Sequence, residues 1–295
     1  MTTPQIHPLT VERHAAQRWQ RHPDYRFAAQ QPLAPLAGFE LQQAATCLPM
    51  AFLAQGDTWV AAAILGVPPA TNLCVTPDGR WTRPYVPAVL RADPFSLYKA
   101  DSGQWLLCVD EASGQVRAGP QGEPFYAEDG QLTPTLQAIL KLLARVEQGR
   151  QAVQRACAAL HQHGLLVPWS IRINTDAGAQ AVSGLFRVDE AALGQLPAEA
   201  LQTLMQAGAL ALAYAQLLSM QHFATLAPQA APGPQPAQAP QALSDAAAAV
   251  APAASPAPGA PGDAAWQVPT ALTSALGDLD LDFLSKSDTL RFDRL

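Results

Sequence analysis

The feature that most restricts the fold of this chain is the apolar segment from Pro197 to Leu226. Its apolar residues recur at steps of three and four, the spacing of one face of an α-helix. Pro197 suits a first helical position, where its missing N–H costs nothing. Glu199 places negative charge in the first turn, as the helix dipole favours. The spacing predicts one long helix whose apolar face comprises Leu201, Leu204, Met205, Gly208, Ala211, Leu212, Ala215 and Leu218.

The middle of this helix is apolar nearly all round, because only Gln216 is polar between Ala209 and Leu218. Such a helix is either buried in a protein or crosses a membrane. A membrane span needs roughly 20 apolar residues, and polar side chains interrupt the run too soon. We therefore expect the central core helix of the fold and no membrane span. The interrupting residues are Gln206, Gln216, Ser219, Gln221 and His222.

The chain before this helix reads as short strands followed by another helix. Apolar runs at residues 47–53 and 58–65 flank a turn and predict a hairpin. A helix is predicted from Thr133, as its cap, to about His163, and a second hairpin around residues 175–178. We therefore predict an α+β fold, in which a mixed or antiparallel sheet of short strands packs on a long buried C-terminal helix.

Composition divides the chain into four regions. Residues 1–24 are polar, with several basic side chains, and are expected to be a frayed extension; the alternative is a short helix that Thr10 caps and that continues through Trp19. Residues 25–226 form the α+β domain. Residues 227–265 are rich in Ala and Pro and lack aromatic residues, so they cannot bury enough apolar surface to order themselves. A coil of that length reaches at least roughly 30–40 Å.

The fourth region, residues 266–295, regains a pattern. Polar and apolar residues alternate from Asp278 to Phe283 and again from Thr289 to Asp293, as in strands with one apolar face. Such an element is marginal alone, so we expect this tail to dock on a sheet edge of its own domain or on a partner. The candidate docking residues are Leu279, Leu281, Phe283, Leu290 and Phe292.

Charge and cysteine usage restrict the partners. The net charge is −6 and no basic run appears, so nucleic acid is not an expected partner. The four cysteines are far apart and have apolar neighbours, which favours buried thiols over a metal site, with a disulfide as the alternative. The N-terminus lacks the basic start and apolar core of a secretory signal. We expect a cytoplasmic protein without a cofactor, and export by a signal-independent route as the alternative.

Familiar catalytic motifs are absent from the sequence, including a Gly-rich phosphate loop, a nucleophile elbow and H-E-x-x-H. Asp110 and Glu111 follow an apolar strand, and adjacent carboxylates can perform acid–base catalysis when one is desolvated. The alternative is a solvated strand end with a helix cap. His161 and His163 have no carboxylate nearby and are expected at a helix end rather than on a metal.

The best candidate site is the loop Trp81–Phe95. Its three prolines prevent a regular central strand, and a short helical turn is expected near residues 88–91. Rigid aromatic side chains with arginines suit recognition of a peptide, a carboxylate or an aromatic ring. The alternative is a structural loop whose aromatic residues belong to the core. The candidate ligand-binding residues are Trp81, Arg83, Tyr85, Arg91, Phe95 and Asp110.

Several motifs follow one another in a recognisable order: NLCV at 72–75, DGRW at 78–81, YVPAVLRADPF at 85–95, LCVDE at 107–111, and the segment 184–226. Together they resemble the SapC family, named for a bacterial surface-layer locus, over about residues 25–226. The resemblance brings no established activity and no catalytic residues. It implies a link to surface-layer transport. It also implies a partner role, because family members lie beside genes for halogenase-like proteins and outer-membrane receptors.

From these observations we expect a non-catalytic accessory or binding protein of a bacterial gene cluster. It would recognise a peptide, a protein, or an aromatic or carboxylate ligand, and a halogenase-like neighbour is one candidate partner. Two alternatives stay open. One is an enzyme that uses Asp110 or Glu111 with a histidine, and the other is a factor for surface-layer protein transport.

Overall fold

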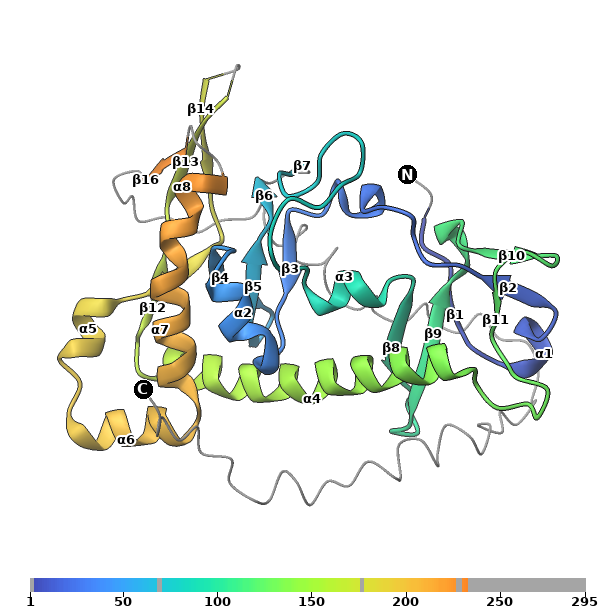
Figure 1. The fold of residues 1–295 in the computed structure, drawn as a ribbon. Coiled ribbons are helices and arrows are strands. Elements are labelled where there is room, and N and C mark those ends of the chain that lie inside the picture. Colours follow the sequence, from blue (N-terminus) through green and yellow to red (C-terminus); the bar gives the residue numbers. More distant parts are fainter. Residues whose placement is uncertain (1–2, 68–70, 176–177, 227–229, 233–295) are drawn as a thin grey trace, which may run out of the picture.

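The computed structural model describes residues 3–67, 71–175, 178–226 and 230–232. The fold is α+β, as predicted: small antiparallel sheets lie along one long helix, α4 (Pro134–Gln162), which runs beneath them in Figure 1. The predicted linker at 227–265, apart from residues 230–232, and the tail at 266–295 lie outside the described residues. The same holds for the candidate docking residues Leu279, Leu281, Phe283, Leu290 and Phe292.

The larger core surrounds a five-stranded antiparallel sheet of order β12-β15-β4-β5-β3. Its centre is the predicted hairpin β4–β5. β4 meets β15 at one residue pair, Phe52 and Phe186. The side chain of Gln216 bridges that junction, because it accepts the N–H of Val188 and donates to the carbonyl of Met50. The strands are β3 (Leu33–Pro35), β4 (Met50–Gln55), β5 (Thr58–Ile64), β12 (Leu166–Pro168) and β15 (Phe186–Val188).

A smaller core lies against two three-stranded sheets, of order β1-β9-β8 and β10-β2-β11. The Trp19 indole is buried here, edge-on to Phe95 with 4.9 Å between the ring centroids. The elements are β1 (Ile6–Pro8), α1 (Val11–His14), β2 (Gln17–Trp19), β8 (Phe95–Lys99), β9 (Trp105–Asp110), β10 (Val116–Ala118) and β11 (Glu123–Pro124).

The expectation of a frayed N-terminal extension is wrong for residues 6–19. β1 pairs with β9, and β2 pairs with both β10 and β11. Thr10 caps α1, as the alternative proposed, although this helix ends at His14. The segment is held by strands far along the chain, so its local polarity does not reveal its burial.

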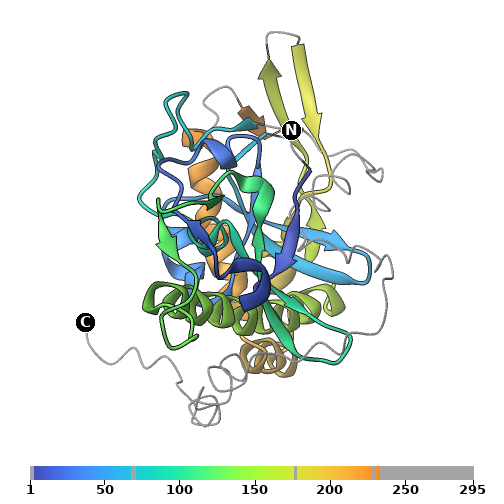
Figure 2. The same cartoon turned by 90° about the vertical axis from the view of Figure 1, so that its right-hand side faces the viewer.

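The remaining elements are short. β13 (Ile171–Thr175) pairs with β14 (Gly178–Val182) and β16 (Ala230–Pro232), and the β13–β14 hairpin projects from the body in both Figure 1 and Figure 2. β6 (Gly66–Val67) pairs with β7 (Thr71–Asn72). The short helices are α2 (Leu41–Ala45), α3 (Ala88–Ala92), which is the predicted helical turn, α5 (Glu190–Gly194), and the 3-10 turns η1 (Arg26–Ala28), η2 (Gly38–Glu40), η3 (Glu111–Ser113) and η4 (Met220–His222).

Helix α4 is the central helix of the fold. It begins where Thr133 and Pro134 predict, and it ends before Gly164, whose φ of +69° is left-handed. The first half of α4 lies in the smaller core and the second half in the larger one. Its buried residues are Leu136, Ile139, Leu140, Leu143 and Ala144, followed by Val153, Ala156, Cys157, Ala159 and Leu160.

The expectation of one continuous helix from Pro197 to Leu226 is wrong. The segment forms α6 (Ala198–Gln206), α7 (Ala209–Ser219), η4 and α8 (Phe223–Leu226), with a bend of 89° between α6 and the stretch that begins at Ala209. Gly208, at φ +71°, ends α6 in the left-handed conformation that glycine favours. α7 buries one face, whereas Tyr214 is 54% and Leu218 is 66% exposed.

Within the described ranges, no single helix has the length and apolar character to cross a membrane. α6 and the α7–η4 stretch meet those criteria only as a bent pair, by length and composition. The bend and the exposed side chains of α7 distinguish this segment from the continuous buried helix that its repeat predicts.

All four cysteines are free and buried, as predicted. Burial raises the pKa of Cys74 and Cys108 to about 11 and that of Cys157 to about 12. Since the thiolate is the reactive form, these thiols behave as small apolar side chains.

Gly149 marks the closest approach of α4 to η2. A Cβ at Gly149 would lie 2.8 Å from the Gly38 nitrogen and 2.9 Å from the Ala37 Cβ. In an open helix, replacing glycine by alanine stabilises by roughly 1 kcal/mol. Here we expect Gly149→Ala to lower the free energy of unfolding by about 1–3 kcal/mol, because the contact becomes overpacked. Urea unfolding measures the difference.

The matched control is Gly194→Ala, at the end of α5, where an added Cβ meets no atom within 4 Å. This variant should be as stable as the wild type or slightly more stable. A Gly149→Ala protein that behaves like the Gly194→Ala protein would contradict the close packing of α4 on η2.

Candidate functional site

A buried carboxylate organises the predicted loop. The Glu40 side chain is fully buried at the end of η2. Its Oε1 accepts hydrogen bonds from the Tyr85 hydroxyl at 2.7 Å and from the Ala88 N–H at 2.6 Å, and its Oε2 accepts the Ala37 N–H at 2.9 Å. Three donors thereby offset the large cost of removing a carboxylate from water. Glu40 thus attaches the loop and the start of α3 to the main body.

Tyr85 is the centre of the loop's own contacts. Its carbonyl accepts a hydrogen bond from the Trp81 indole at 2.9 Å, and its hydroxyl accepts one from the Arg91 guanidinium at 3.3 Å. The same guanidinium lies 5.6 Å from the centroid of the Tyr85 ring, within the range of a cation–π contact. Burial, together with the bond to Glu40, raises the pKa of Tyr85 well above its ordinary value. The hydroxyl therefore remains a hydrogen-bond donor to Glu40.

The six predicted ligand-binding residues do not form one cluster. Trp81, Tyr85 and Arg91 lie together, as described. Arg83 lies beside the buried Cys74 thiol, where it slightly opposes the effect of burial on the thiol pKa. Phe95 belongs to the smaller core, and Asp110 lies at the end of β9. Sequence reasoning missed Glu40; its only signal is a single acidic residue in an otherwise uncharged stretch, residues 27–56.

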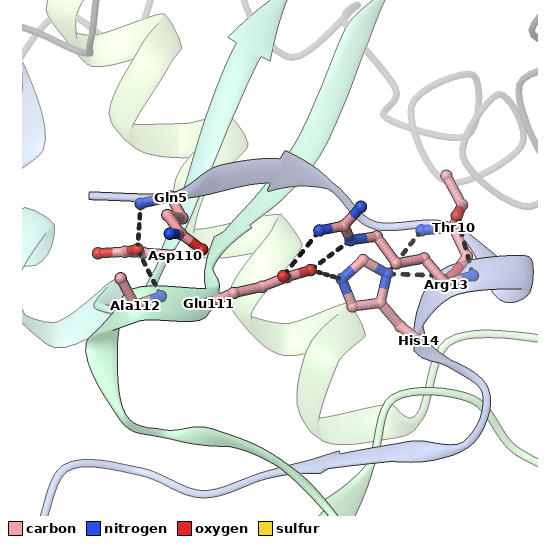
Figure 3. Close-up of polar contacts among 7 residues, drawn as sticks. All are labelled: Gln5, Thr10, Arg13, His14, Asp110, Glu111 and Ala112. Atoms are coloured by element: carbon pink, nitrogen blue, oxygen red, sulfur yellow. Dashed lines mark hydrogen bonds and ion pairs between the residues drawn. The ribbon is translucent and has the colours of Figure 1, made fainter. Parts of the chain in front are cut away.

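The Asp110–Glu111 pair fastens the N-terminal segment to β9 (Figure 3). Asp110 Oδ1 accepts the N–H of Gln5 at 2.8 Å and the N–H of Ala112 at 3.0 Å, which caps η3. Glu111 binds both nitrogens of the Arg13 fork, with 2.9 Å between Nη2 and Oε2. This bond to Arg13 lowers the pKa of Glu111.

Glu111 also meets a histidine, as the enzyme alternative required. His14 Nε2 lies 3.1 Å from Glu111 Oε1, and His14 Nδ1 lies 3.2 Å from both the backbone nitrogen and the carbonyl oxygen of Thr10. The His14 side chain is fully buried, and burial lowers its pKa. Both ring nitrogens therefore contact protein groups in an enclosed position, an arrangement that holds α1 against η3.

A cavity of about 240 Å³ lies elsewhere, between the edges of two sheets. Figure 1 shows α3 between β3 and β8, with α4 below. The floor is made by α4 and one wall by α3, which Glu40 positions. Three consecutive residues come from the β3 side and three from β8. The lining residues are Pro35, Leu36, Ala37, Val89, Asp93, Phe95, Ser96, Leu97, Leu143, Val146, Glu147 and Arg150.

β8 presents unpaired backbone groups to this cavity. It is an end strand of its sheet in the described part of the chain. The Asp110 N–H donates to the Pro94 carbonyl, and bonded and non-bonded positions alternate along an antiparallel pair. Phe95 and Leu97 therefore direct their backbone N–H and C=O away from β9, toward the open edge.

β3 brings one such group, the carbonyl of Pro35, to the other side of the cavity. It ends the five-stranded sheet, again as far as the described residues go. The Leu36 N–H donates to the Ala61 carbonyl, so the alternation turns the backbone groups of Leu33 and the carbonyl of Pro35 away from β5. Two open strand edges thus border one cavity.

The charged residues of the cavity already have partners. Arg150 Nε donates to Glu147 Oε2 at 2.8 Å, and this bond raises the pKa of Arg150. Asp93 Oδ1 lies 2.6 Å from His22 Nε2. The other lining side chains are mostly apolar. The arrangement suits an extended peptide with apolar side chains better than it suits a charged small molecule.

We expect Glu40→Gln to lower the free energy of unfolding by about 2–3 kcal/mol, because a carboxamide leaves one buried donor facing an NH₂ group. Tyr85→Phe removes one donor and leaves the carboxylate with the other two, so it should cost about 1 kcal/mol. Urea unfolding of both variants tests this order. Equal losses in the two variants would show that the carboxylate charge is not what holds the loop.

We also expect the free energy of unfolding to fall as the pH is lowered from 7 toward 5. Burial lowers the pKa of His14 in the folded protein, whereas the unfolded chain binds a proton near the ordinary pKa of about 6.5. The unfolded state binds more protons in this range, so stability rises with pH. Further acidification through the lowered pKa of Glu111 removes its bond to Arg13 and continues the loss.

His14→Gln should flatten the decrease between pH 7 and pH 5, as measured by urea unfolding at several pH values. An unchanged slope in His14→Gln would contradict the role given to His14.

Comparison with known proteins identifies the family. Residues 9–226 match the sequence model of the SapC family. No curated protein and no solved structure matches the chain. The matched range begins within the N-terminal segment that the fold incorporates and ends at the last residue of α8. The chain belongs to the SapC family.

Proposed function

We propose that this chain is a non-catalytic accessory protein that binds an extended segment of a partner protein between β3 and β8. The observation that carries the proposal is the pair of open strand edges on either side of an apolar cavity. An added strand would exchange backbone hydrogen bonds with Phe95 and Leu97 of β8, while Pro35 lines the far side of the cavity.

The floor of the cavity would select apolar side chains. Leu143 and Val146 of α4 face it, and side chains at alternate positions of an added strand would pack on them. Since the cavity is bordered by three residues of each edge segment, the bound core is about three residues, or about 10 Å of strand. Affinity for so short a segment would be modest, as expected for a regulatory contact.

The remaining features fit an accessory role better than the enzyme alternative. Asp110 and Glu111 are engaged in bonds that hold the N-terminal segment. The family resemblance suggests where partners are found: a bacterial gene cluster with a halogenase-like protein, acting in the cytoplasm, or the surface-layer transport after which the family is named.

The test is isothermal titration of the full chain with the purified halogenase-like neighbour and, separately, with a surface-layer protein. Val146→Glu puts a carboxylate among the apolar side chains that line the cavity and should weaken binding at least about tenfold, which is a loss of about 1.4 kcal/mol. Leu218→Glu, on the exposed face of α7, is the control and should not weaken it. Binding lost in Leu218→Glu and kept in Val146→Glu would move the partner site to α7 and overturn the proposal.

A further inference from the structure

We propose that the chain's own segment Asp278–Phe283 is a ligand of the cavity between β3 and β8, where it adds as a strand and competes with the partner. This inference rests on the proposed function and names a regulator of the same site. The segment lies outside the described residues.

The segment has the pattern that the cavity requires. Its residues alternate between aspartate and apolar side chains, with Leu279, Leu281 and Phe283 on one face of a strand. Along β8, the side chains of Phe95 and Leu97 share the face that packs with the smaller core. An added strand in the same orientation places its leucines and phenylalanine over α4, next to these two residues.

The acidic face meets no unpaired negative charge. The carboxylates in the cavity lining are Asp93 and Glu147, and each is already bound, to His22 and to Arg150. The three aspartates of the segment would occupy the opposite face, toward solvent. Burial of the apolar face would therefore not be opposed by a nearby bare carboxylate.

The tether is long enough. The last described residue before the tail is Pro232, and residues 233–277 separate it from the segment. At about 5–6 Å times the square root of their number, these residues span roughly 34–40 Å. A folded domain the size of residues 1–226 has a radius of gyration of about 17 Å. The cavity is therefore within reach from the end of the described chain.

Tethering also offsets the small size of the contact. A linker of this kind gives an effective concentration of about 1 mM. A segment that binds with a Kd of about 0.1 mM would then occupy its own cavity about nine-tenths of the time, and an external partner would bind about tenfold more weakly. The tail would thus raise the concentration of partner that is needed to occupy the cavity.

The second alternating stretch of the tail provides a matched control. It contains only Leu290 and Phe292 on its apolar face, and Arg291 and Asp293 have opposite charges. It therefore lacks the third apolar residue and the uniform acidic face of the first stretch. Changes in this stretch alter tail composition without altering the proposed ligand.

The experiment uses the full chain in two forms. One carries Leu279→Ser, Leu281→Ser and Phe283→Ser, and the other carries Leu290→Ser and Phe292→Ser. Both sets lie outside the described residues, so neither changes a side chain of the two described cores. Hydrogen–deuterium exchange detected by mass spectrometry follows the β8 amides, where Phe95 and Leu97 are the N–H groups that face the cavity. We expect exchange at β8 to be about tenfold faster in the triple variant than in the wild type, and unchanged in the control.

A synthetic peptide covering residues 277–284, added to the triple variant, should restore the slow exchange, and the partner should bind the triple variant about tenfold more tightly than the wild type. Equal β8 exchange in wild type and triple variant would overturn the inference, while partner binding that is sensitive to Val146→Glu would still support the proposed function. Slow exchange that disappears on dilution would overturn the intramolecular form, because the tail would then occupy a second copy.

Discussion

The architecture around the cavity depends on one buried carboxylate. Moving a carboxylate out of water costs several kcal/mol unless hydrogen bonds replace the lost hydration. Glu40 receives three such bonds, and they come from three places in the chain: the start of η2, the loop at Tyr85, and the first turn of α3. One side chain therefore determines where α3 lies, and α3 leads directly into β8. The position of the open β8 edge therefore depends on the hydrogen bonds that the Glu40 carboxylate accepts.

The two cores are different in kind. The larger one is enclosed by a five-stranded sheet and by α7, whose Gln216 supplies hydrogen bonds where β4 and β15 barely pair. The smaller one is completed by the N-terminal segment, which Glu111 holds through Arg13 and His14. The cavity lies between them because neither sheet extends far enough to meet the other. A cavity at such a junction needs no special residues of its own.

Sequence patterns predicted the parts of this fold that local physics determines. The β4–β5 hairpin, the start of α4 at Thr133 and the turn of α3 follow from apolar spacing, caps and prolines within a few residues. The bend at Gly208 was missed because a glycine within an apolar repeat is compatible with a continuous helix. The N-terminal strands were missed because their partners are distant in sequence. Among the six predicted ligand-binding residues, Phe95 lines the cavity. Glu40 is marked only as a single acidic residue in an uncharged stretch, and Val146 has no local signal at all.

Helix α4 contributes its first half to one core and its second half to the other. At about 1.5 Å per residue, its 29 residues form a rod of roughly 44 Å. Two separate helices joined by a flexible loop would let each core unfold on its own. Because one continuous helix belongs to both cores, unfolding at either end disturbs the packing of the other core. The two cores should therefore unfold in a single cooperative transition. A destabilising substitution in one core should also reduce the protection of backbone amides from hydrogen exchange in the other core.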